Sequence, residues 1–573
     1  MQQLDTTSAE SVLQRAGVAS SVEAVEFLGA VCRVSPSDVR EALVALRDSD
    51  LSLGYLVDFF GVDTGEAIDV VYHLRSFARD EELVLKSAHD YDSTLESVWD
   101  IHPSALMPER ETAELLGLRL SGHPNPKRLL TTDGCPPYLR KSLAVRGADE
   151  VRDRAAQQVE VTGRERPAGT LAEPIVEEAR SPFDTSPPAT PEPMPKPLGL
   201  KRAPTGVDTL GSENLILNMG PQHPSTHGVL RLILELDGET IVSGESVIGY
   251  LHRGIEKLAE SRRYSAVGTL MDRGDYLAGI HSELAFALAT EQLAGIEVPR
   301  RANYLRSLLG ELNRIASHIT WYGPMGLDAG AMGQFLYTFR DREAILDILE
   351  DITGQRMMFN YVRPGGVVND ITTTAEAKIR RFLDDFAVHI EENDELLMGN
   401  EIFQARTQGV GVFSREAVLG FGLSGACARG SGVDFDIRRD RPYAAYPELD
   451  FEVPVVEAGD IYSRCRVRLD EMRQSARMIR QCIDGLPEGE HTAKVAKVLR
   501  PAAGEAYAAT ESPRGELGVH LIADGTDSPY RMRYRPPALY ALQAGEAMLP
   551  GNLIADAVVL MGSMDLILGE VDR

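Results

Sequence analysis

A proline-rich stretch in the middle of the chain limits what this sequence can fold into. Residues 180–197 read RSPFDTSPPATPEPMPKP, with prolines recurring along the stretch and few apolar side chains. Such a segment cannot bury enough apolar surface to offset the entropy lost on ordering, and its prolines favour an extended backbone. We therefore predict a disordered linker over residues 150–212, between one domain at 1–149 and a second at 213–573.

The composition is that of a folded globular protein rather than a disordered or membrane-embedded one. The chain has 573 residues, of which 43% are hydrophobic and 25% charged, and it is too long for one ordinary core. No apolar run is long enough to span a bilayer, and the N-terminus has no secretory pattern. The formal net charge of -27 argues against nucleic acid as a partner, because phosphate binding needs clustered Lys and Arg.

Cysteines give no sign of a metal or a cluster site. The five are scattered singly, without the Cys-x-x-Cys spacing of zinc, iron–sulfur or redox sites. We therefore expect reduced thiols and no metal bound by this chain. These residues are Cys32, Cys135, Cys427, Cys465 and Cys482.

The pattern of apolar residues predicts an α+β protein. In the first domain, a helix over 39–46 and strands over 53–60, 67–74 and 82–86 indicate a small α/β layer. The second domain begins with a strand-like run at 229–236 and then becomes mainly helical. Its predicted helices cover residues 301–320, 341–352 and 375–397.

A loop rich in proline and glycine opens the second domain. Residues 220–231 read GPQHPSTHGVLR, which places His223 and His227 between prolines and Gly228. Proline fixes φ and glycine tolerates unusual φ, so this loop suits side chains that must be held in place. From the residues alone, His227 is more often a hydrogen-bonded loop histidine than a functional one. The His-x-x-x-His spacing suggests a metal site on a helix, but Pro224 argues against a continuous helix.

This loop and the sequence LHRGIEKLAE at 251–260 resemble the 49-kDa subunit of proton-pumping NADH:quinone oxidoreductase, respiratory complex I. The resemblance extends over residues 214–573 and implies a fold like that of the [NiFe]-hydrogenase large subunit. In the first domain, ERETAELLGL at 109–118 and GHPNPKRLL at 122–130 resemble the 30-kDa subunit of the same enzyme. The chain is thus expected to be a fusion of two complex I subunits.

The 30-kDa-like segment carries charges at helical spacing. Glu109, Arg110 and Glu114 are expected to form i,i+4 charge pairs, and a simple solvated face is the alternative. Residues 106–108 stand where that family carries an aromatic residue, and residues 139–143 match its later arginine-lysine motif only loosely. The surface toward a partner is therefore expected to be modified.

Three residues are the candidates for catalysis. Quinone reduction builds negative charge on two carbonyl oxygens, which need hydrogen-bond donors and then protons. The resemblance implies that His227 and Tyr276 hold the quinone head group, and that Asp328, expected just beyond the long helix, pairs with His227 and raises its pKa. From the residues alone, Tyr276 is more often core or surface and Asp328 a helix or turn cap. Gly274 replaces a family methionine, which predicts a roomier or more flexible loop.

Further residues are expected to act near the electron donor. The resemblance places Arg253 near the iron–sulfur cluster of a neighbouring subunit. His223 and Arg273 are predicted with it as cofactor-binding residues. A structural ion pair of Arg253 with Glu256 or Glu260 is the alternative. Two polar residues of the long helix, Glu311 and His318, are expected to serve in packing.

The resemblance also implies partners and location. Expected partners are the cluster-bearing small subunit, a ferredoxin-like subunit, NADH-binding subunits of the peripheral arm and membrane-arm subunits, with quinone (ubiquinone or menaquinone) as substrate. No cofactor is expected on this chain itself, which would lie peripherally at the cytoplasmic face of the cell membrane and couple quinone reduction to proton translocation.

Two other functions compete with this interpretation. A [NiFe] hydrogenase needs two Cys-x-x-Cys pairs for its metals, and this sequence has neither. A scaffold subunit that has lost quinone chemistry stays possible because of the changes at Gly274 and in the first domain. A free-standing soluble NADH or nucleotide enzyme is disfavoured, because no Rossmann glycine fingerprint or P-loop is present.

Overall fold

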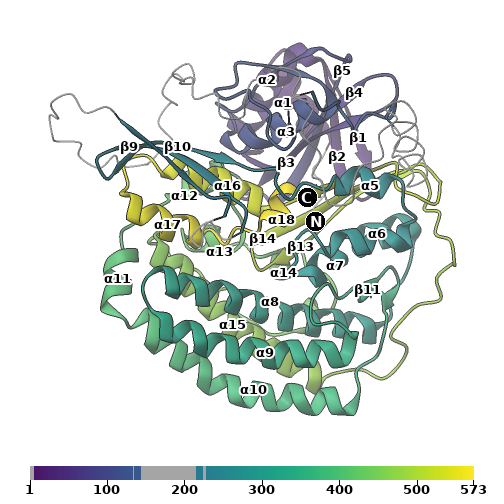
Figure 1. Ribbon diagram of the computed structural model, residues 1–573. Coiled ribbons are helices and arrows are strands. Elements are labelled where there is room, and N and C mark those ends of the chain that lie inside the picture. Colours follow the sequence, from purple (N-terminus) through teal and green to yellow (C-terminus); the bar gives the residue numbers. More distant parts are fainter. Residues whose placement is uncertain (1–5, 133, 144–213, 223–227) are drawn as a thin grey trace, which may run out of the picture.

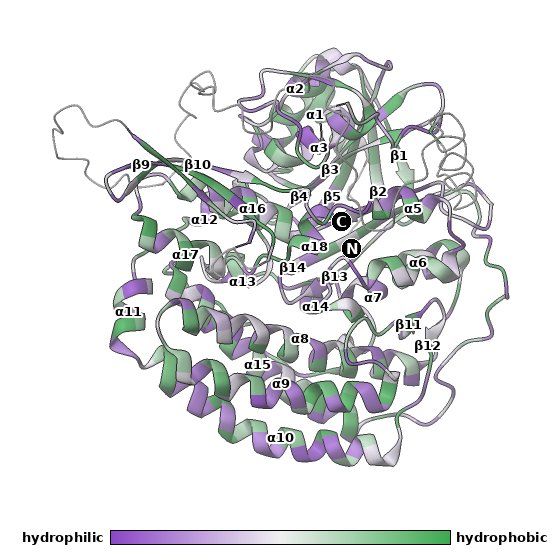
Figure 2. Cartoon of the chain, in the orientation of Figure 1, coloured by the Kyte–Doolittle hydropathy of each residue, from purple (hydrophilic) through white to green (hydrophobic). Residues whose placement is uncertain are grey.

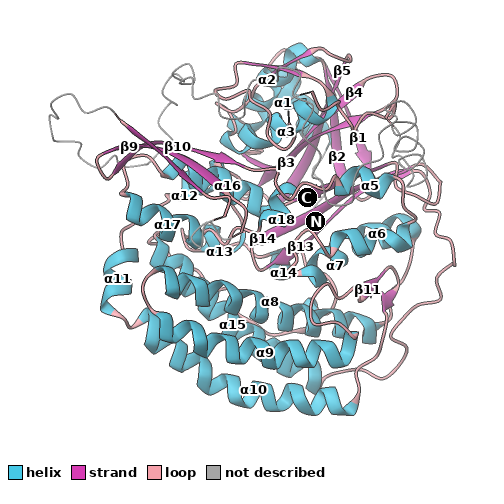
Figure 3. Ribbon diagram, viewed as in Figure 1, coloured by secondary structure: helices cyan, strands magenta, loops and turns pink. Residues whose placement is uncertain are grey.

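The fold comes from a computed structural model, which describes residues 6–132, 134–143, 214–222 and 228–573 (Figure 1). The predicted linker at 150–212 lies outside these residues. Both helices and strands are present, as expected for an α+β protein. Figure 3 shows the strands near the middle and top and the long helices below.

A five-stranded sheet forms the first domain, in the order β1-β2-β5-β4-β3. Only β2 and β5 pair in parallel; the other neighbours are antiparallel. The helix predicted at 39–46 and the strands predicted at 53–60, 67–74 and 82–86 are confirmed as α2, β3, β4 and β5. The bounds are α1 (Thr6–Arg15), β1 (Ser20–Val25), β2 (Gly29–Val34), α2 (Val39–Asp48), β3 (Tyr55–Asp63), β4 (Ile68–Ser76) and β5 (Glu81–His89).

Helix α3 (Leu106–Leu116) packs on β3 and buries the charges that were expected to pair along its surface. Glu109 instead accepts a hydrogen bond from the backbone N–H of Val98 at 2.7 Å, and Glu114 accepts from three consecutive N–H groups at 129–131. Arg110 donates to two backbone carbonyls. The expectations of i,i+4 pairs and of a solvated face are both wrong, because these side chains satisfy loop backbone that would otherwise be buried without partners. Short β6 (Thr94–Glu96) and β7 (Arg119–Ser121) flank this helix.

Strands open the second domain and long helices follow. The strand-like run at 229–236 is confirmed as β9 (Arg231–Asp237), which lies between β8 (Leu215–Met219) and β10 (Thr240–Val247). Three shorter helices come next: α5 (Ile255–Glu260), α6 (Tyr264–Met271) and α7 (Gly279–Ala294).

Helices α8 (Arg300–Asp328), α9 (Met332–Thr353), α10 (Thr373–Asn393) and α15 (Ile461–Asp484) form the bundle at the bottom of Figure 1. The predicted apolar stripe of the first of these is buried from Leu305 to Ile319. Helix α8 does not end near Thr320, however: it continues through Pro324 to Asp328. Figure 2 shows polar residues along the outward side of α10, as expected for an amphipathic surface helix.

A second antiparallel sheet was not predicted from the sequence. It consists of β13 (Gly504–Ser512), β14 (Gly515–Ala523) and β15 (Arg531–Arg535). In Figure 1 it lies between the first domain and the bundle, with α16 (Pro537–Met548) and α18 (Leu568–Asp572) beside it. Strand β15 alternates arginine with Met532 and Tyr534, yet every residue of the strand is buried.

The two domains meet through buried ion pairs. Arg75 of β4 binds the carboxylate of Glu516 in β14 through two hydrogen bonds of 2.6 Å each. Arg533 of β15 binds Asp58 of β3 through two more, each of 3.0 Å. Such bidentate pairs are geometrically specific, so they fix the register of one sheet against the other.

No described helix is both long enough and apolar enough to cross a membrane.

We expect Glu516→Ala to lower the free energy of unfolding of the full chain by about 3–5 kcal/mol, because it leaves part of the Arg75 charge buried without its partner. Burial alone would raise the pKa of Glu516, but Arg75 and Arg535 outweigh it and lower the pKa to about 2. The matched control is Asp69→Ala, which removes a more exposed pair with Arg33 and should cost less than about 1 kcal/mol. Equal losses in urea titrations of the two variants would contradict the role of burial.

Candidate functional site

The loop with the two candidate histidines is described only at its ends. His223 and His227 lie outside the described residues, and so does the expected pairing of His227 with Asp328. The loop leaves β8 through a cis Gly220–Pro221 peptide bond and returns at Gly228, whose φ is 131°. A Cβ on Gly228 would lie 3.9 Å from the Leu568 side chain, so the loop returns beside the C-terminal helix α18.

Tyr276 lies in the turn between α6 and α7 and is half-buried. Its ring packs against the backbone of Gly569 in α18, where a Cβ would come within 3.0 Å of the ring. Burial raises the pKa of Tyr276; the positive charge of Arg514 opposes this shift, and the negative charges of Asp275 and Asp565 add to it. The hydroxyl accepts or donates no hydrogen bond within the part of the chain that the structure describes. The phenol is therefore protonated at neutral pH and available to a ligand.

A buried ion pair holds this turn in place. Asp275 binds Arg514 of the β13–β14 turn at 2.6 Å, and Arg514 also donates to Ser317 of α8 at 3.1 Å and lies 3.4 Å from Asp565. Burial raises the pKa of Asp275 although Arg514 opposes the shift. Burial and the nearby Asp275 also raise the pKa of Glu570, to about 8. The turn that carries Tyr276 is thus held by contacts among four segments that are distant in the sequence: the turn itself, the β13–β14 turn, α8 and the segment around Asp565.

Gly274 does not make this turn roomier, contrary to one of the two expectations from its replacement of methionine, and the other expectation, a more flexible turn, stays a prediction. It is buried, and a Cβ there would lie 3.1 Å from the Tyr534 hydroxyl. A Cβ on Gly569 would in turn lie 2.8 Å from the Gly274 carbonyl oxygen. The space that a side chain would need is taken by Tyr534 of β15, and α18 approaches the same residue at its carbonyl oxygen.

A narrow crevice opens beside Tyr276. One wall comes from α8, a second from α9, and a third from the loop of residues 356–362. Arg342 of α9 closes one side and donates to the Thr320 hydroxyl at 2.9 Å. The lining residues are Tyr276, Leu277, Asn313, Ala316, Thr320, Arg342, Leu346, Arg356, Met357 and Phe359.

Asp328 is the last residue of α8, so the prediction that it lies beyond the helix is wrong. The helix continues past Pro324 while it packs against α9 and α15. Asp328 is half-buried, and its backbone carbonyl accepts a hydrogen bond from Arg406 at 3.1 Å.

Arg253 is exposed and forms no ion pair with any acidic side chain that the structure describes. The alternative of a structural pair is therefore wrong for both expected partners. Glu256 binds Arg531 at 2.8 Å, and Glu260 binds Lys141 at 3.0 Å. Arg273 is half-buried and donates to the Thr269 carbonyl at 2.5 Å.

Glu311 and His318 are not ordinary packing residues, as the sequence had suggested. They belong to a buried charge network between α8 and α15, in which His318 lies 2.9 Å from Glu471 and Glu311 lies 3.1 Å from Arg314. Burial lowers the pKa of His318 despite the nearby Glu471. The sequence signal was weak: charged residues at helical spacing usually mark a solvated face. The other members are Arg429, Asp436, Arg438 and Glu511.

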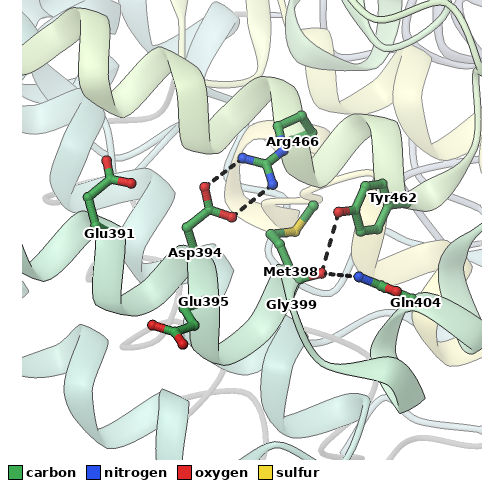
Figure 4. Close-up of a pocket in the computed structure, with 8 residues that line it drawn as sticks. All are labelled: Glu391, Asp394, Glu395, Met398, Gly399, Gln404, Tyr462 and Arg466. Atoms are coloured by element: carbon green, nitrogen blue, oxygen red, sulfur yellow. Dashed lines mark hydrogen bonds and ion pairs between the residues drawn. The ribbon is translucent and has the colours of Figure 1, made fainter.

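A shallow hollow elsewhere in the bundle is shown in Figure 4. Asp394 accepts two hydrogen bonds from Arg466, at 2.7 and 2.8 Å, and the Met398 carbonyl accepts one from Gln404 at 2.7 Å. These hydrogen bonds already engage Asp394, Arg466 and the Met398 carbonyl, so they offer no open group to a ligand. Among the described residues, no three His, Cys, Asp or Glu side chains converge as a metal site.

Comparison with known proteins identifies both halves of the chain. Residues 328–573 match the family described as respiratory-chain NADH dehydrogenase, 49 Kd subunit, and residues 32–149 match the 30 Kd subunit of the same enzyme. The D subunit of NADH-quinone oxidoreductase from Desulforamulus reducens is 47% identical over 364 residues, which are 64% of this chain and 100% of the relative. The D 2 subunit of the Solibacter usitatus enzyme is 46% identical over 364 residues, 64% of this chain and 98% of the relative. The D subunit of the Dehalococcoides mccartyi enzyme is 48% identical over 363 residues, 63% of this chain and 99% of the relative. The chain therefore belongs to the 49-kDa, or D, subunit family of NADH-quinone oxidoreductase, and it carries a domain of the 30-kDa family in the same polypeptide.

Proposed function

We propose that this fused subunit of NADH-quinone oxidoreductase forms the quinone head-group site, with Tyr276, His227 and Asp328 as its working residues. The observation that carries the proposal is the state of Tyr276. Its hydroxyl stays protonated and has no hydrogen bond to any described residue, although the turn around it is fixed by the Asp275–Arg514 ion pair. A preorganised donor with an open hydrogen bond suits an oxygen on which negative charge develops.

The reaction needs two electrons and two protons for each quinone. Tyr276 would donate a hydrogen bond to one carbonyl oxygen and pass its proton as the charge builds, while His227 would serve the other oxygen. Asp328 would orient His227 and favour its protonated form, because a carboxylate beside an imidazole raises the imidazole pKa. Each donor must then be reprotonated before the next turnover.

Electrons would arrive from an iron–sulfur cluster held by a neighbouring subunit. Arg253, exposed and without an acidic partner among the described residues, would face that cluster together with Arg273 and His223. A fixed positive charge raises the reduction potential of a nearby cluster and so favours electron arrival. On this proposal the chain itself binds no cofactor.

The chain is part of an oxidoreductase complex, and we propose its neighbours within it. They would be the cluster-bearing small subunit, the ferredoxin-like subunit, the NADH-binding subunits and the membrane arm, at the cytoplasmic face of the cell membrane. The long helices after an initial β region also support the proposal that the second domain shares the [NiFe]-hydrogenase large-subunit fold.

Tyr276→Phe tests the site in membranes that carry the assembled complex. We expect quinone reduction to fall by about 10²-fold, the usual contribution of a positioned acid, while reduction of an artificial acceptor that takes electrons upstream is retained. The matched control is Tyr304→Phe, which removes a hydroxyl that binds Glu448 in the same domain and should leave both activities near their original values. Unchanged quinone reduction in Tyr276→Phe would instead favour a scaffold role for the chain.

Asp328→Asn tests the coupling to proton translocation. We expect loss of proton pumping with quinone reduction largely retained, because the amide keeps the shape of the side chain and removes its charge. Acidification by inverted vesicles, measured beside quinone reduction, reports both activities. Asp385→Asn on the exposed side of α10 is the control, and normal pumping in Asp328→Asn would refute the coupling role.

A further inference from the structure

Two buried carboxyl groups interact with each other, one on either side of Tyr276 in the sequence. Asp272 follows the end of α6 and Glu283 lies in the second turn of α7, and their exposed fractions are 0% and 1%. The two groups lie within hydrogen-bonding distance of one another. No lysine or arginine that the structure describes comes within ion-pair distance of either, so neither carboxyl has an ion-pair partner.

The hydrogen bonds of these carboxyls account for only half of their oxygens. One oxygen of Asp272 accepts from the Asn360 N–H at 2.9 Å. One oxygen of Glu283 accepts from the N–H groups of Tyr361 and Val362, at 2.8 and 2.7 Å. The remaining two, Asp272 Oδ1 and Glu283 Oε1, are buried and have no donor. A proton between the two carboxyls satisfies both at once, whereas two ionised groups would repel each other without screening.

We propose that Asp272 and Glu283 share one proton, and that this protonated pair fastens the loop of residues 356–362 beside Tyr276. The pair acts as a positioning element for the quinone site, so the inference rests on the function proposed above. Its action on the site is indirect, through the loop.

The fastened loop is one that needs outside support. Met358 and Asn360 have φ values of 57° and 47°, in the left-handed region that costs energy for residues with a side chain. Three consecutive N–H groups, from Asn360 to Val362, bind the carboxyl pair. Met357 and Phe359 of the same loop line the crevice at Tyr276. By holding this loop in place, the shared proton sets the width of the crevice.

The surroundings of the pair favour retention of the proton. Burial, followed by Asp272, raises the pKa of Glu283 well above its usual range, and burial raises the pKa of Asp272. Arg273, on the same turn, opposes the shift at Asp272. Tyr534 of β15 faces the preceding Ser282 at 3.2 Å, and its own pKa is raised by burial and by Glu570. From α8 this end of α7 meets the neutral Asn313, and from the loop Arg363 binds the Asn360 carbonyl at 3.4 Å.

The sign of the pH effect follows from the raised pKa. A carboxyl whose pKa is raised in the folded protein keeps its proton to higher pH than a free carboxyl, and its contribution is complete at low pH and lost as pH rises through the folded pKa. Quinone reduction should therefore decline on the alkaline side as the pair ionises and the loop is released.

Glu283→Gln separates the shared proton from the shape of the pair. The amide N–H₂ of glutamine can donate to Asp272 Oδ1 and its oxygen can still accept from residues 361 and 362, so Asp272 keeps a donor after it loses its own proton and position 283 no longer titrates. Relative to the artificial-acceptor activity at each pH, we expect the alkaline decline of quinone reduction in this variant to move up by about one pH unit or more. Glu283→Ala, which deletes both bonds, should raise the KM for quinone by about tenfold at every pH.

Glu291→Gln is the matched control on the same helix. Glu291 is buried and already neutralised by Arg306, so this change should lower thermal stability without moving the alkaline decline. An alkaline decline in Glu283→Gln identical to that of the unmodified complex would overturn the shared proton. That outcome leaves the Tyr276→Phe result untouched, so the two proposals fail separately. If Glu283→Gln does not assemble, Asp272→Asn makes the same test with the donor on the other side of the pair.

Discussion

The sheet of β13, β14 and β15, here called the central sheet, is joined to the first domain by buried ion pairs of arginine. The rest of the structure depends on this interaction. Arg533 joins Asp58 of the first domain to its own sheet, and Arg75 reaches back from the first domain to Glu516. Each charge sits away from water, where it is tolerated only with a well-oriented partner. These pairs form the seam, the contact between the two domains, and they form in only one relative placement of the domains. Loss of any partner leaves a buried charge unpaired. A fusion of the two subunits fits such a seam, since the halves are always made together.

The candidate quinone site inherits its geometry from this central sheet. Arg514, in the turn between β13 and β14, anchors Asp275, and the Gly569 backbone supports the ring of Tyr276. Chain segments nearly 300 residues apart thus meet under one hydroxyl group. Rigid support of this kind keeps a donor aimed without reorganisation at the moment when charge develops. The opposite wall of the crevice, by contrast, is the strained loop of residues 356–362. Because the proposed protonated pair fastens this loop, pH regulates the site through this wall.

The two halves of the site use buried carboxyl groups in different ways. Asp275 is balanced by Arg514, so it serves as a fixed negative charge beside a fixed positive one. Asp272 and Glu283 have no lysine or arginine within ion-pair distance among the described residues, so on the proposal above a proton takes the place of the missing positive charge. Low dielectric and exclusion of water make both arrangements strong, and they make the second one sensitive to pH.

The sequence by itself determined the apolar stripe of α8, the strands of the first domain and the family motifs, because these are local patterns of spacing and composition, and the division around a proline-rich segment stays a prediction. It pointed to Tyr276 through a motif alone, and the positions of His223 and His227 stay a prediction. Only the tertiary structure decided that β15 is a buried strand, that Glu109, Arg110 and Glu114 bind backbone, and that Asp328 closes α8. Whether a charged residue is solvated or buried depends on its partner, and Arg75 finds Glu516 at a separation of 441 positions, beyond anything that local spacing encodes.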